Sequence, residues 1–65
     1  MKEKLKQAFL SHADGHVKKH VANVEVLLNN PIGIAQHGDI LTEVEKELEE
    51  VAKYEDLINV MNKYF

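Results

Sequence analysis

Apolar residues recur along two long stretches of the chain at the spacing of an amphipathic helix. In each stretch they return every three or four residues, which places them on one side of a helix. The first stripe consists of Leu5, Phe9, Ala13, Val17, Val21, Val24 and Leu28. The second consists of Leu41, Val44, Leu48, Val51, Ile58, Met61 and Phe65. The pattern predicts two helices, over about 2–29 and 39–63.

The segment between the two stripes has the composition of a turn. Pro31 disfavours a helical backbone at Asn30, and the asparagines and glycines around it supply turn chemistry. Asp39 suits the first turn of the second helix. Gly15 could mark a break in the first helix, but the apolar stripe keeps its phase across it. We therefore predict an all-α, antiparallel two-helix hairpin that forms a single domain over residues 1–65.

The small size of the chain predicts self-association. Its 65 residues include no cysteine, so neither a disulfide nor a thiolate zinc site is available to stabilise it. Two helices side by side also expose more surface than a compact globule does. We therefore expect two hairpins to pair as a homodimer, which forms a four-helix bundle.

Small residues recur every seven positions on one flank of the first helix, at Ala8, Gly15 and Ala22. Small residues at this spacing let another helix approach closely. The alternative is that alanine is simply a good helix former and that Gly15 is a local kink. Our candidates for the dimer interface are Ala8, Gly15, Ala22, Leu48 and Val51.

Histidines and glutamates lie inside the predicted apolar arcs. His12, His16 and His20 follow each other at intervals of four residues, so their imidazoles project along one line of a helix. Histidine and carboxylate from facing helices form the metal sites of helical bundles. This makes His16, His20, Glu47 and Glu55 candidate metal ligands. The alternative is a histidine–glutamate pair that fixes the register of the two helices.

Charge and motifs narrow the expected function. Up to Asn30 there are five lysines and three acidic residues, and from Pro31 onward three lysines and eight acidic residues. Arginine is absent, which argues against nucleic-acid binding. The glutamate-rich start of the second helix is either a solvated face or a surface for a basic partner. We find no catalytic serine–histidine–acid set and no phosphate loop, so we expect neither an enzyme nor a cofactor.

The N-terminal residues are charged and lack the apolar core of a secretory signal, and no apolar run approaches the length of a membrane span. We therefore expect a cytoplasmic protein that does not bind membranes.

Three stretches of the chain carry a resemblance to known proteins: Asn23-Val24-Glu25-Val26-Leu27-Leu28-Asn29-Asn30-Pro31-Ile32-Gly33-Ile34, His37-Gly38-Asp39-Ile40-Leu41 and Lys63-Tyr64-Phe65. With these stretches the chain resembles a family of small uncharacterised proteins from T4-like marine phages and ocean metagenomes. It is a general similarity from about His12 to Phe65 and includes no catalytic motif. It implies action in the cytoplasm of a host bacterium or in the virion.

Together these features predict a non-enzymatic homodimer that acts by protein–protein interaction, as a phage accessory factor that binds a host or phage protein. The alternatives are a structural or assembly component of the phage particle and a metal-binding helical bundle.

Overall fold

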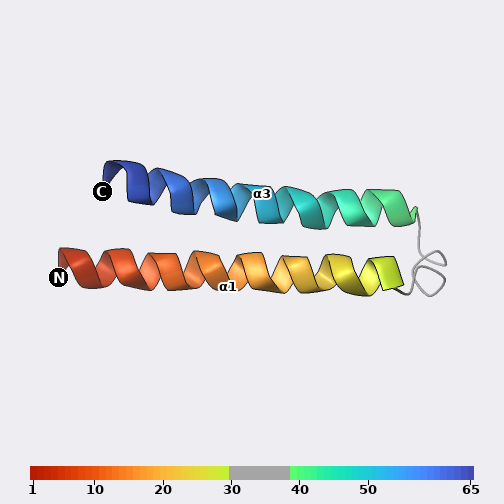
Figure 1. Ribbon diagram of the computed structural model, residues 1–65, viewed down its shortest axis with the longest axis horizontal. Helices are drawn as coiled ribbons and strands as arrows, with labels where there is room; N and C mark the ends of the chain where they lie inside the picture. The colour runs from red at the N-terminus through yellow and green to blue at the C-terminus, as the bar shows by residue number, and fades with distance from the viewer. Residues whose placement is uncertain (30–38) are drawn as a thin grey trace.

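The computed structural model describes residues 1–29 and 39–65, and these form two helices. Helix α1 runs Lys2–Asn29 and helix α3 runs Ile40–Tyr64. The helices lie side by side and antiparallel, so that the N-terminus and the C-terminus share one end of the molecule (Figure 1). We call this the open end, and we call the other end, where α1 stops and α3 starts, the closed end. The predicted two-helix hairpin is confirmed for the described residues, and the predicted turn at 30–38 lies outside them.

Local hydrogen bonds account for where the helices begin and end. The Asp39 carboxylate accepts from the Leu41 amide at 3.0 Å and from the Thr42 hydroxyl at 3.2 Å, which caps the start of α3. At the end of α1, the Asn29 side chain donates to the Glu25 carbonyl at 2.8 Å. The Asp39 side chain therefore satisfies a backbone amide that the start of α3 leaves unpaired.

The face of α1 that packs on α3 repeats every seven residues. Ala13 is fully buried and Leu27 is 8% exposed, and no other described residue is buried. The half-buried positions follow the same repeat: they are Lys6, Phe9, Leu10, His16, Val17, His20, Asn23 and Val24. This is the 3.5-residue period of two helices that stay in contact over many turns.

The predicted apolar stripe of α1 is confirmed in part, because Phe9, Ala13, Val17 and Val24 lie in the contact with α3. Leu5, Val21 and Leu28 are 64%, 40% and 66% exposed, so three members of the stripe lie off the contact with α3. A step of four residues turns by 400°, so a stripe built on such steps drifts about 40° each time and leaves the contact.

Helix α3 also differs in part from its predicted apolar stripe. Its half-buried positions are Ile40, Glu43, Val44, Glu47, Glu50, Val51, Tyr54, Ile58 and Met61. No residue of α3 is fully buried, and Leu41 and Leu48 from the predicted stripe are 73% and 50% exposed. The contact between the helices therefore includes polar side chains, while several large apolar side chains lie outside it.

Gly15 lies within α1 without interrupting the helix, as predicted. A Cβ atom added at this position would meet nothing within 4 Å. We therefore expect Gly15→Ala to raise the free energy of unfolding by about 0.5–1 kcal/mol, because glycine loses more backbone entropy than alanine on helix formation. Urea denaturation measures the change. Ala22→Gly, seven residues along the same flank, is the matched control and should lower the value by a similar amount. A destabilised Gly15→Ala variant would contradict the open environment of this site.

Candidate functional site

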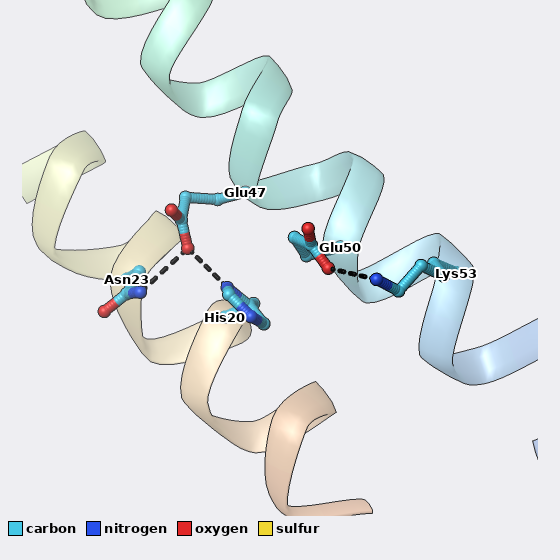
Figure 2. A network of polar contacts seen from close by, with 5 residues as sticks. All are labelled: His20, Asn23, Glu47, Glu50 and Lys53. Atoms are coloured by element: carbon cyan, nitrogen blue, oxygen red, sulfur yellow. Dashed lines mark hydrogen bonds and ion pairs between the residues drawn. The ribbon is translucent and has the colours of Figure 1, made fainter. Parts of the chain in front are cut away.

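A polar cluster joins the two helices in the half of their contact that lies towards the closed end. It consists of His20 and Asn23 from α1 and Glu47 from α3 (Figure 2). His20 and Asn23 are three residues apart and therefore project from the same side of α1. The Glu47 Oε1 atom lies 2.7 Å from His20 Nδ1 and 2.8 Å from Asn23 Nδ2. A single carboxylate oxygen thus accepts two hydrogen bonds from the facing helix.

The hydrogen bonds of the cluster hold Glu47 in its ionised form. The bond from His20, and then the bond from Asn23, lower the pKa of the Glu47 carboxyl below its ordinary value of 4.5, against the opposing effect of burial. An ionised carboxylate only accepts hydrogen bonds, so the hydrogen in the contact with His20 resides on Nδ1. The His20 and Glu47 side chains are 12% and 23% exposed, so water screens this pair only partly.

Next to the cluster, Tyr54 of α3 packs against three histidines of α1. Its ring lies parallel to that of His16, with centroids 4.3 Å apart and planes 8° apart. The rings of His12 and His20 lie 6.2 and 6.5 Å from the same tyrosine. We call His12, His16, His20 and Tyr54 the aromatic ladder. The ladder and the polar cluster share His20, so they form one continuous contact between the helices.

His16 stands out within the ladder because its Nδ1 atom is buried without a hydrogen-bond partner. Burial lowers the pKa of His16 below 6.5, and the neighbouring positive charge of His12 and Lys19 lowers it further. The protonated form of His16 is therefore disfavoured, and its ring packs between His12, His20 and Tyr54.

The four predicted metal ligands are only partly brought together. His20 and Glu47 are in direct contact, and His16 stacks on Tyr54. Glu55 is exposed and borders a separate surface hollow. In residues 1–29 and 39–65, no group of three or more histidine or acidic side chains is placed to hold a metal ion. The His20–Glu47 contact is a histidine–glutamate pair between the helices, the kind of contact that the sequence offered as the alternative to a metal site.

Sequence reasoning missed two members of this site, Asn23 and Tyr54. Asn23 follows Phe9 and His16 at intervals of seven residues, and Tyr54 follows Glu47 in the same way. The seven-residue repeat was the signal that would have placed both residues in the contact.

Most of the predicted dimer-interface residues lie open on the hairpin surface. Ala8, Gly15, Ala22 and Leu48 are exposed, and Val51 is half-buried. Leu48 and Val51 lie on the side of α3 that carries other exposed apolar residues. Ala8, Gly15 and Ala22 lie on the side of α1 that faces away from α3.

Acidification is expected to destabilise the protein in two pH ranges. The pKa of His16 is lower in the folded chain than its ordinary 6.5, so its contribution to stability is complete above about pH 6.5 and is lost as the pH falls towards the folded value. The pKa of Glu47 is also lowered, so its contribution is complete above about pH 4.5 and is lost as the pH falls through the folded value.

Urea midpoints measured across this pH range test both steps. His16→Gln should remove the loss that begins near pH 6.5 and leave the loss below pH 4.5 in place. A midpoint that stays constant on acidification from neutral pH would contradict the buried, neutral state of His16.

Neither of the two described helices combines the length and the apolar character that crossing a membrane requires. Comparison with known proteins adds no assignment, because no protein-family model, no curated protein and no solved structure matches the chain.

Proposed function

We propose that this chain is a non-enzymatic helical protein that acts by protein–protein interaction, and that its first partner is a second copy of itself. Two hairpins then form a four-helix bundle. The observation that carries the proposal is the incomplete core of the single hairpin. Among the described residues only Ala13 and Leu27 are buried, while eleven large hydrophobic residues are at least 38% exposed.

The exposed area of the chain supports this proposal. The chain exposes 5020 Å², whereas a compact monomer of 7.4 kDa is expected to expose about 4,200 Å². The hairpin therefore exposes more surface than a compact monomer of the same mass, as two helices side by side are expected to do.

The polar cluster and the aromatic ladder fit a binding protein better than a catalyst. In the polar cluster, His20 and Asn23 donate to Glu47 across the helix contact, and in the ladder the rings pack on one another. Such contacts fix which residues of the two helices face each other. A fixed register holds the outer faces of the two helices in one arrangement. The exposed acidic residues Glu45, Glu49 and Asp56 of α3 are then free to bind a further, basic partner.

The concentration dependence of unfolding tests the proposal. If folding is coupled to dimerisation, each tenfold increase in protein concentration adds about 1.4 kcal/mol to the free energy of unfolding of the dimer. The thermal midpoint should therefore rise by several degrees for each tenfold step. A midpoint that does not change with concentration would show that the hairpin folds alone.

A further inference from the structure

One side of the hairpin carries a row of exposed apolar residues near the closed end. One surface hollow is bordered by Asp14 and Val17 of α1 and by Glu55 and Ile58 of α3. These four positions therefore lie on the same side of the hairpin. Residues seven positions apart lie on the same side of a pair of packed helices. Steps of seven from Asp14 and Glu55 towards the closed end reach four apolar residues. We call them the apolar face: Val21, Leu28, Leu41 and Leu48.

The apolar face is open along its whole length. Its four residues are 40%, 66%, 73% and 50% exposed, in chain order. Between them lie Val24, Val44 and Val51, which are half-buried. Branched apolar side chains from both helices therefore form one continuous surface at the closed end.

The other side of the hairpin is more polar near the closed end, although Val26 lies on it and is 62% exposed. Its hollow near the closed end is bordered by Asn23, Val26, Leu27, Glu43 and Glu47. On α3 this side also carries the ion pairs Lys46–Glu43 at 3.6 Å and Lys53–Glu50 at 3.2 Å, again related by steps of seven. Near the closed end, the hairpin thus has one side that is mostly apolar and one side that is more polar.

The charges of the two helices distinguish two ways of pairing the apolar faces. Helix α1 has five lysines and three acidic residues, and α3 has three lysines and seven acidic residues. If the two closed ends lie at the same end of the bundle, each α1 faces the α3 of the partner. If they lie at opposite ends, α1 faces α1 and the two acidic α3 helices face each other. Charge complementarity favours closed ends at the same end.

The position of the apolar face along the hairpin leads to the same arrangement. The face occupies only the half near the closed end, and further along the same side stand Asp14 and Glu55. With the closed ends together, the two apolar faces cover each other. With the closed ends opposed, a dimer centred on the hairpin places each apolar face against the polar half of its partner.

We infer that a second copy of this chain covers the apolar face, and that the two copies pair with their closed ends at the same end of a four-helix bundle. This inference rests on the proposed self-association. It makes the Ala8–Gly15–Ala22 flank an outer surface of the bundle, and it places Asp14 and Glu55 at the edge of the interface. Lys18, 2.9 Å from Asp14, offsets part of the acidic charge there.

Two substitutions near the end of α1 test the face. Leu28 and Val26 are 66% and 62% exposed and lie two residues apart on opposite sides of the hairpin. Leu28→Glu buries a charge in the inferred interface, so the dimer should dissociate at least a hundredfold more readily. Val26→Glu introduces the same charge on the polar side and should leave dimerisation unchanged. Sedimentation equilibrium of both variants, with circular dichroism to confirm that they remain helical, gives the comparison.

The result separates this inference from the proposed function. If the unmodified chain is a monomer at every concentration, the proposed function fails and the inference fails with it. If the unmodified chain is a dimer and Leu28→Glu leaves it intact, self-association stands but the apolar face is not its interface. Loss of the dimer in Val26→Glu alone would assign the interface to the opposite side.

The orientation of the two copies is tested by cross-linking, for which the absence of cysteine in the chain gives a clean background. Val21 and Leu48 lie at the same level of the hairpin, so with closed ends together Val21 of one copy faces Leu48 of the other. Oxidising a mixture of Val21→Cys and Leu48→Cys chains should therefore give disulfide-linked heterodimers. Cross-linking of Val21→Cys with Leu10→Cys instead, in an intact dimer, would show the closed ends at opposite ends and would overturn the inferred orientation.

Discussion

Replacing Glu47 with alanine should lower the free energy of unfolding by about 2–3 kcal/mol, because hydrogen bonds to charged groups are stronger than those between neutral groups. Glu47 accepts from His20 at 2.7 Å and from Asn23 at 2.8 Å, and its side chain is 23% exposed. The substitution removes both bonds and leaves two partly buried donors of α1 without an acceptor. Urea denaturation at neutral pH measures the loss.

Two further variants show which property of Glu47 matters. Glu47→Gln keeps an oxygen that can accept both hydrogen bonds and removes only the charge, so it should cost less than alanine. Glu45→Ala removes an exposed carboxylate from the same helix and should change stability little. If Glu47→Ala were no more destabilising than Glu45→Ala, the cluster would not hold the two helices together.

Replacing Tyr54 with alanine should lower the free energy of unfolding by about 2–4 kcal/mol, because it removes the ring that contacts three residues of the facing helix. The closest of these contacts is the parallel stack on His16, with centroids 4.3 Å apart. The cavity would lie in the middle of the helix pair, where few other apolar side chains can fill it.

Tyr54→Phe is the control for this prediction. It keeps the ring and removes the hydroxyl, so it should retain most of the stability that alanine loses. The difference between the two variants in urea denaturation measures the contribution of the ring. Equal losses in the alanine and phenylalanine variants would contradict the stacking, since the hydroxyl would then account for the whole effect.

The sequence predicted the helices of this fold well because local signals determine them. Pro31 and the surrounding asparagines and glycines mark the break, and Asp39 caps α3 as expected from its position. Gly15 does not interrupt α1, because one glycine costs only about 1 kcal/mol in a helix of this length.

The phase of the helix contact was predicted only in part, because apolar residues on α1 and α3 cover more than one side of each helix. Leu28 and Leu48 continue an apolar spacing of four, yet both are at least 50% exposed in the hairpin. The sites that replace them in the contact include Asn23, which a search for apolar stripes passes over. Such a surplus of apolar positions is expected of a chain with a second interface to fill.

The breadth of the apolar arcs also explains why the candidate site was predicted only in part. His20 and Glu47 were found because each falls within a broad apolar arc, and the structure brings them into contact. Glu55 falls within the same arc but lies on the open side, next to Asp14. Whether such a residue lies in the contact depends on which residues of the two helices face each other. The pattern along one helix does not determine this register.

Sedimentation equilibrium of the unmodified chain over a hundredfold concentration range tests the central claim most directly. Self-association predicts a mass of twice 7.4 kDa that falls towards one chain mass only on dilution. A mass that stays at 7.4 kDa throughout would mean that the single hairpin is stable with its apolar face open, and would contradict the account.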